Sequence, residues 1–324
     1  MTQDIPLPQT DAGLAEAKRS RHVMLGIGAA IAGSAVFSLN DLFIKQLSGT
    51  YALHQVILVR GLVGVAFILA FAVLSGQRQF WRTKRPMMHL IRACIVMVSN
   101  ATYFLGLAAL PLADAAAIGF VAPLLLTMLS VLVLREKVGW HRWGAVVVGL
   151  IGVVVMLRPE GQFQWAAVLV LISALCYAIT QTMTRMFRDT ESAVTINFYT
   201  QVAFIVLSAS MGLWTGDGHL AGSSDASLAF LFRPWGMPPL GDWIYFVGTG
   251  VSVAIGGLLM AQAYRMNETA LVAPFEYTSM PLAVIWGLIF FGTFPDLQGW
   301  VGIALIIGAG LYTLYREARR RHRV

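Results

Sequence analysis

Ten apolar stretches, separated mostly by short polar connections, run through this sequence from residue 22 to residue 316. A helix needs roughly 20 apolar residues to cross the hydrocarbon core of a bilayer, and most of the stretches reach that length. They are residues 22–47, 54–75, 87–109, 112–134, 140–157, 164–186, 192–214, 242–264, 269–291 and 298–316. The pattern predicts an all-α membrane protein with ten transmembrane helices. The long connection 215–241 has an apolar part that we expect to lie on the membrane surface.

The composition excludes a soluble protein. The chain is 57% hydrophobic and only 12% charged, whereas about a quarter of the residues in soluble domains are charged. A soluble α/β enzyme would also need polar faces on its surface helices, and most stretches here are apolar all round. The net charge of +7 does not indicate a nucleic-acid partner, because the basic residues lie between and beyond the apolar stretches.

The Lys and Arg residues fall mainly on one side of the predicted membrane. Cytoplasmic connections of membrane proteins carry the excess of these residues. With the N-terminus in the cytoplasm, the basic residues on that side are Lys18, Arg19, Arg21, Arg78, Arg82, Lys84, Arg85, Arg135, Lys137, Arg142, Arg185, Arg188, Arg265, Arg316, Arg319, Arg320, Arg321 and Arg323. The other side has only Arg158 and Arg233. We therefore expect a multi-pass protein of the cell inner membrane with both termini cytoplasmic, residues 1–21 and 317–324 being tails.

The two halves of the chain are similar to each other. An offset of 158 residues aligns three pairs, Pro123 with Pro281, Gly144 with Gly302 and Gly152 with Gly310. Earlier in the unit an offset of about 140 residues pairs Phe37 with Tyr177 and Lys45 with Arg185. The units are residues 22–158 and 164–316. Each has five spans, so the second must cross the membrane in the opposite sense. Inverted repeats are typical of secondary transporters, whose substrate site lies between the halves near the bilayer midplane.

Three segments resemble the drug/metabolite transporter superfamily, specifically its EamA-type ten-helix members, over about residues 22–316. They are FSLNDLFIK in the first span, PLADAAAIGFVAPLLLTMLSVLVLREKVGWHRWGAVVVGLIGVVVMLRP across the fourth and fifth, and ALVAPFEYTSMPLAVIWGLIFFGTFPDLQGWVGIALIIGAGLYTLYRE across the ninth and tenth. The resemblance implies two inverted five-helix repeats and secondary transport of a small organic metabolite across the bacterial inner membrane by alternating access. APFEYT and FPDLQGW are similar to a bacterial branch that includes riboflavin and S-adenosylmethionine transporters. A flavin, an amino-acid-like or a nucleoside-like substrate all remain open.

Asp41 and Arg60 are ionisable residues inside the first two spans. Such groups cost about 2.5–3.5 kcal/mol on insertion scales, so each indicates a pairing or functional role. At a rise of about 1.5 Å per residue, the two lie at similar depths. They either neutralise each other for insertion or take part in gating or substrate binding. Lys45 and Arg92 lie nearer the span ends, and we expect both to snorkel to the surface.

Glu276 lies about 10 Å inside the ninth span by helical rise, and no basic residue stands one turn away on the same helix. Burial without a local partner favours the neutral acid. The carboxyl group then either hydrogen-bonds a substrate, carries a coupling proton, or makes a helix-to-helix hydrogen bond with no role in transport.

Polar and aromatic residues inside the spans are candidates for lining a substrate pocket together with Glu276. They are Asn40, Asn100, Tyr103, Phe120, Tyr177, Gln181, Asn197, Tyr199, Gln262 and Tyr277. Each is also a residue type that packs or hydrogen-bonds between membrane helices. As a set they predict an amphipathic pocket for a small molecule with a flat or apolar part. Pro123 and Pro281 are expected to loosen the fourth and ninth spans.

Catalytic motifs are absent from the sequence, which has neither H-E-x-x-H nor a P-loop. Cys94 and Cys176 lie singly inside apolar stretches and indicate neither a disulfide nor a metal site. We therefore expect no enzymatic activity, no cofactor and no metal, and a monomer or homodimer in the lipid bilayer. The rival classes are a membrane-embedded enzyme acting on a lipid-like substrate and a sensor without transport. The direction of transport and any coupling ion stay open.

Overall fold

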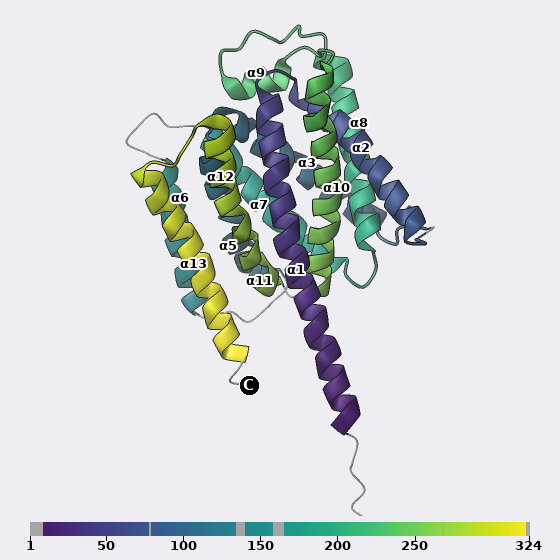
Figure 1. Ribbon diagram of the computed structural model, residues 1–324, viewed down its shortest axis with the longest axis vertical. Coiled ribbons are helices and arrows are strands. Elements are labelled where there is room, and N and C mark those ends of the chain that lie inside the picture. The colour runs from purple at the N-terminus through teal and green to yellow at the C-terminus, as the bar shows by residue number, and fades with distance from the viewer. Residues whose placement is uncertain (1–8, 78, 134–139, 158–164, 268, 322–324) are drawn as a thin grey trace, which may run out of the picture.

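The computed structural model describes residues 9–77, 79–133, 140–157, 165–267 and 269–321, and these residues form a bundle of helices (Figure 1). The helices are α1 (Gln9–Ser48), α2 (Leu53–Leu74), α3 (Pro86–Ala109), α4 (Leu112–Gly119), α5 (Ala122–Leu132), α6 (Trp140–Leu157), α7 (Trp165–Met186), α8 (Ala193–Thr215), α9 (Ala226–Phe232), η1 (Leu240–Asp242), α10 (Trp243–Met266), α11 (Thr269–Val272), η2 (Ala273–Ser279), α12 (Met280–Phe291) and α13 (Leu297–Arg321). We call the end with the start of α1 and the close of α13 the α13 end, and the opposite end the α9 end.

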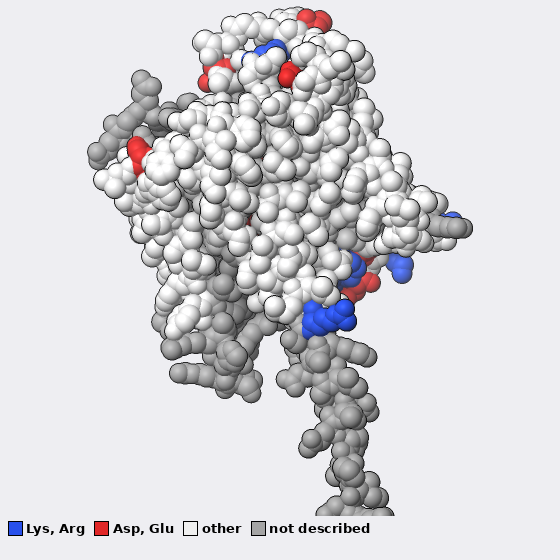
Figure 2. Space-filling model, viewed as in Figure 1, with Lys and Arg blue, Asp and Glu red and all other residues white. Residues whose placement is uncertain are grey.

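All ten predicted spans correspond to apolar helices. Among the described residues, 6 helices are long and apolar enough to cross a membrane, and spans four, five, nine and ten appear as the shorter apolar stretches Leu112–Leu126, Trp143–Met156, Phe275–Phe291 and Leu297–Tyr312. On the face shown in Figure 2, the visible charged residues lie mainly toward the two ends of the bundle, and the surface between them is almost entirely uncharged. The chain is a multi-pass membrane protein, as the sequence predicts.

Spans four and nine are broken, whereas the sequence predicts continuous helices over 112–134 and 269–291. Span four stops at Phe120, and α5 starts with Pro123 in its first turn. Span nine changes from α11 to the 3-10 segment η2, and α12 starts with Pro281 in its first turn. Proline is tolerated there because the first-turn N–H groups have no partner within the helix. The two prolines, which were expected only to loosen these spans, each lie in the first turn of the helix that follows a break.

Each span of the first half packs mainly against a span of the second half. α1 contacts α10, α2 contacts α8, α3 contacts α7, α4 contacts α12 and α6 contacts α13. In Figure 1 the α6–α13 pair lies at one edge of the bundle and the α2–α8 pair at the other. The two inverted five-helix repeats are thus interleaved rather than standing side by side as separate bundles.

The connection after α8 packs across the α9 end of the bundle (Figure 1), and its expected place on the membrane surface stays a prediction. Phe230 on α9 is fully buried, and the Ser227 hydroxyl donates to the Leu105 carbonyl of α3 at 2.7 Å. Phe230 therefore packs against the bundle, while Met237 and Leu240 of the same connection are exposed. We call residues 226–242, from α9 through η1, the strap.

Lys45 and Arg185 occupy corresponding places in the two repeats. Lys45 Nζ donates to the carbonyls of Leu107, Ala108 and Leu110 at 2.6, 3.1 and 2.7 Å, where α3 ends. Arg185 Nη1 donates to the carbonyls of Arg265 and Asn267 at 3.4 and 2.6 Å, where α10 ends. A cation is favourable at a helix C-terminus, where carbonyls lack partners. Lys45 therefore does not snorkel. The two residues that the repeat offset aligns, Lys45 and Arg185, each cap the C-terminus of another helix.

Candidate functional site

A central cavity of about 210 Å³ lies where spans of both repeats meet. Its lining combines residues of α1, α2, α3, α7, α10 and η2 with residues around the break between α4 and α5. Helix breaks leave backbone groups unpaired within the helix, and in membrane transporters such breaks line the substrate site. The two broken spans, four and nine, both contribute to this cavity through Phe120 and Glu276.

Asp41 and Arg60 both line the central cavity. Each forms a hydrogen bond with a residue of α3. Asp41 accepts from the Tyr103 hydroxyl at 2.8 Å, and Arg60 Nη2 donates to Asn100 Oδ1 at 3.2 Å. Tyr103 and Asn100 are one turn apart on α3, so that helix connects the two charged groups. The polar chain Asp41–Tyr103 and Asn100–Arg60 brings four of the predicted site residues to one wall.

Arg60 is the largest fully buried side chain described. Its guanidinium carbon lies 5.1 Å from the ring centre of Phe104 and 4.6 Å from that of Phe204. Aromatic faces attract a cation, and the attraction is stronger where water is excluded. The two rings therefore hold the guanidinium at the cavity wall while its Nε has no hydrogen-bond partner among the described residues.

Glu276 lies in η2 and reaches its partners on other helices. The Tyr264 hydroxyl of α10 donates to Glu276 Oε1, and the Tyr177 hydroxyl of α7 also hydrogen-bonds this carboxyl group. Its exposed fraction is 8%. The sequence contains no partner one turn away on the same helix, and the fold supplies two phenols instead. The carboxyl group is thereby held by two other helices of the second repeat, at the wall of the central cavity.

Buried polar atoms without protein partners face the same space. Ser34 Oγ, Ser38 Oγ and Asn40 Oδ1 have no hydrogen-bond partner among the described residues, and all three residues line the central cavity. Buried polar groups are normally satisfied, so such atoms are available to water or to a polar ligand. Phe37 and Phe120 in the same lining supply apolar faces. The cavity can therefore bind a molecule that has both polar groups and a flat apolar part.

A second cavity of about 110 Å³ adjoins the first and shares Phe37, Ser99, Asn100 and Tyr177 with it. Its remaining polar lining comes from α3, α7 and α8: Arg92, Thr180, Gln181, Asn197, Thr200 and Gln201. Asn197 Nδ2 donates to the Ala254 carbonyl at 3.1 Å. The two cavities are thus neighbours that have part of one wall in common.

Most of the predicted pocket residues meet in these cavities. Those lining the first are Asn40, Asp41, Arg60, Asn100, Tyr103, Phe120, Tyr177 and Glu276. Those lining the second include Gln181 and Asn197.

The remaining three predicted pocket residues lie outside both linings. Tyr199 donates to the Trp81 carbonyl at 2.7 Å, Gln262 accepts from Arg265 at 3.2 Å, and Tyr277 packs behind Phe120 with ring centres 5.5 Å apart. The prediction omitted the serines of the first cavity. A signal for them was present, because Ser34, Ser38 and Asp41 recur at helical spacing along one face of the first span.

The chain has relatives of known function and a solved structural neighbour. It matches the EamA-like transporter family over residues 24–158 and 164–315. It is 27% identical over 285 residues to an S-adenosylmethionine uptake transporter of Rickettsia prowazekii, a match covering 87% of this chain and 90% of the relative. It is 28% identical over 306 residues to a riboflavin transporter of Rhizobium johnstonii, covering 94% and 95%. A crystal structure of a protein with 18% sequence identity superposes on the chain with a TM-score of 0.66. The match covers 93% of this chain and 98% of the other protein's chain, so the two share a fold.

Proposed function

Because the chain belongs to the EamA-like transporter family, we propose that a small amphipathic metabolite crosses the membrane through its central cavity by alternating access. The observation that carries this proposal is a cavity at the junction of two inverted repeats, lined by carboxyl groups, a guanidinium and aromatic rings. Inverted-repeat carriers expose such a site first to one side of the membrane and then to the other.

The chemistry of the lining supports a cargo with a flat ring and a polar chain. Phe37, Phe120 and Tyr177 offer aromatic faces, and Asp41 and Glu276 offer carboxyl groups. Aromatic rings stack on flat heteroaromatic groups, and buried carboxyl groups select hydroxyl, amine or cationic partners. S-adenosylmethionine and riboflavin, the compounds named for the two relatives, both combine a heteroaromatic ring with a polar chain. They head the list of compounds to test.

The basic residues support an orientation with the α13 end in the cytoplasm of a bacterial inner membrane. Lys and Arg accumulate in the connections at that end, as positive-inside orientation requires. We propose no cofactor and no chemical conversion of the cargo.

Counterflow in proteoliposomes tests the proposal. The purified chain is reconstituted into vesicles loaded with unlabelled riboflavin, S-adenosylmethionine, nucleosides or amino acids, and entry of the same labelled compound is measured. We expect one class to exchange and to be recovered intact. Recovery of an altered compound would indicate an enzyme, and saturable binding without exchange would indicate a sensor.

A pair of tyrosine variants tests whether the central cavity is the transport site. Tyr103→Phe removes the hydroxyl that donates to Asp41 inside the cavity, and we expect exchange to fall about tenfold because that bond involves a charged acceptor. Tyr199→Phe removes a hydroxyl that lies outside both cavities and serves as the matched control, with exchange expected to stay near the unmodified rate. Equal effects of the two substitutions would contradict the assignment.

A further inference from the structure

Arg92 is a buried cation on α3 that the helix bundle positions through neutral groups. Its exposed fraction is 8%, so it does not snorkel as the sequence led us to expect. Nε donates to Thr184 Oγ1 of α7 at 3.3 Å, and Nη1 donates to Thr200 Oγ1 of α8 at 2.6 Å. Each hydroxyl in turn donates to a carbonyl one turn earlier in its own helix, at 3.0 and 2.8 Å. The guanidinium is thus held firmly in place by two neighbouring helices.

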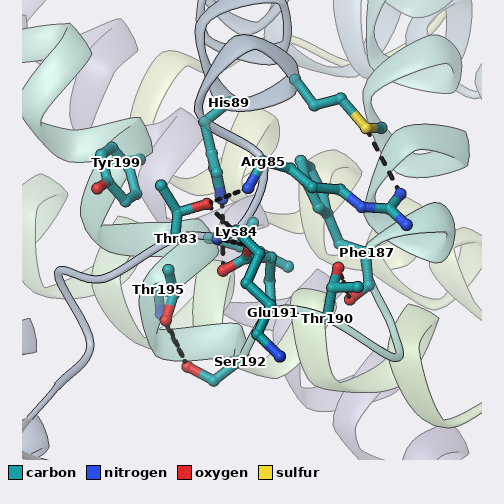
Figure 3. A network of polar contacts seen from close by, with 12 residues as sticks. Thr83, Lys84, Arg85, His89, Phe187, Thr190, Glu191, Ser192, Thr195 and Tyr199 are labelled. Carbon is teal, nitrogen blue, oxygen red and sulfur yellow. Dashed lines mark hydrogen bonds and ion pairs between the residues drawn. The ribbon is translucent and has the colours of Figure 1, made fainter.

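No carboxylate of the described residues forms an ion pair with Arg92. The nearby Glu191 is engaged elsewhere, since it accepts from Thr83 Oγ1 at 2.8 Å and from the Lys84 N–H at 3.0 Å. Its other oxygen lies 3.7 Å from His89 Nε2. Figure 3 shows this cluster, in which the loops before α3 and after α7 meet. A buried cation whose partners are all neutral has an uncompensated charge, and an anion bound beside it compensates that charge.

The cluster also separates Arg92 from the α13 end of the bundle. His89, one turn before Arg92 on α3, stacks against Phe187 and Tyr199 with ring centres 4.6 Å away on each side (Figure 3). This stack explains why Tyr199 lies outside the cavities. On its other side the second cavity shares part of its wall with the central cavity.

Arg92 lines the second cavity beside an unpartnered amide oxygen. Gln201 Oε1 belongs to a fully buried side chain and has no hydrogen-bond partner among the described residues, while its amide nitrogen bonds Asn197 Oδ1 at 3.4 Å. The guanidinium has no hydrogen bond from Nη2 to a described residue. A carboxylate binds a guanidinium through charge-assisted hydrogen bonds, and the free amide oxygen accepts from an adjacent amine. A cation and an acceptor therefore line one small space.

We propose that the second cavity binds the carboxylate of an amino-acid-like cargo through Arg92 while the rest of the cargo occupies the central cavity. This inference rests on the proposed function and narrows its substrate class to small organic carboxylates. A neutral flat molecule such as riboflavin makes no use of Arg92. The carboxyl groups Asp41 and Glu276 in the first cavity complement a cationic or amine-bearing portion of the same cargo.

Binding of S-adenosylmethionine and of decarboxylated S-adenosylmethionine to the purified full chain in detergent tests the proposal, because the two probes differ only in the carboxylate. The affinity of each probe is measured by calorimetry. We expect the decarboxylated probe to bind the unmodified protein at least about tenfold more weakly than S-adenosylmethionine does, because it lacks a hydrogen bond to a charged group. Arg92→Gln is expected to remove that preference, and Arg92→Lys to retain part of it.

Two further variants keep the test informative if Arg92→Gln does not fold. Thr200→Val removes the shorter of the two bonds to the guanidinium and is expected to weaken binding of the carboxylate probe about threefold to tenfold without affecting the decarboxylated one. Arg85→Gln, on an exposed residue before α3, is the matched control and should change neither affinity.

Equal affinity of the two probes for the unmodified protein, including no binding of either, would overturn the proposal, as would a preference that survives Arg92→Gln. The counterflow assay is independent of this result. Exchange of riboflavin together with equal affinities would leave the transporter function standing while removing the carboxylate site.

Discussion

Lys45 joins two helices through a single charged group. Its ammonium donates to three carbonyls at the end of α3. We expect Lys45→Met to lower the free energy of unfolding by roughly 2–3 kcal/mol, since it leaves carbonyls without a donor and removes a hydrogen bond from a charged group. A thermal unfolding curve in detergent measures this loss. Lys84→Met, at an exposed residue, is the control, and an equal shift in both variants would contradict the capping role.

The sequence predicted where along its span a charged residue lies, but not where its side chain points. Helical rise placed Asp41, Arg60 and Glu276 inside their spans, and all three side chains line the central cavity. Lys45 and Arg92 were expected to reach the surface because they lie near span ends. They turn inward instead, since a helix end and two threonine hydroxyls on other helices provide their partners. Such partners depend on how helices pack, which a single sequence does not reveal.

At the scale of elements, α6 and α13 approach each other closely at two glycines. A Cβ atom added to Gly152 would lie 2.9 Å from Leu305 Cβ and 3.0 Å from the Gly302 carbonyl oxygen. We expect Gly152→Leu to separate the two helices at a cost of about 1–3 kcal/mol. The midpoint of thermal inactivation of counterflow measures the effect.

Gly308→Leu is the matched control on α13, because a Cβ atom there meets nothing within 4 Å. A larger loss from Gly308→Leu than from Gly152→Leu would contradict this close packing.

The broken spans show what hydropathy can and cannot predict about an element. An apolar stretch from 269 to 291 predicts that the chain crosses the membrane there, and it does. The 3-10 segment that carries Glu276 has no hydropathy signal of its own. Its local signs are Pro274 in its own first turn and Pro281 just after it, whose repeat partner Pro123 marks the corresponding break in span four. Comparison of the two repeats was therefore more informative about the breaks than either stretch alone.

At the scale of the whole molecule, the pairing of spans across the repeats makes each half dependent on the other. The main neighbours of α1, α2 and α3 are α10, α8 and α7. We expect residues 1–158 expressed alone to be unstable, because those packing faces would have no partner, and likewise residues 159–324. Co-expression of the two fragments should give a complex that an affinity tag on one fragment recovers. A stable, monodisperse single fragment in size-exclusion chromatography would contradict this dependence.

The strap has a consequence for the order in which the protein is made. Arg233 donates to the carbonyls of Ser48 and Tyr51 at 2.9 and 3.1 Å, and Gln55 exchanges two hydrogen bonds with Gly236 at 2.6 and 3.2 Å. The turn between the first two helices thus obtains these hydrogen-bond partners from residues nearly two hundred positions later in the chain. A ribosome completes seven spans before that turn can be satisfied, so the earliest hairpin to enter the membrane is among the last to reach its final structure.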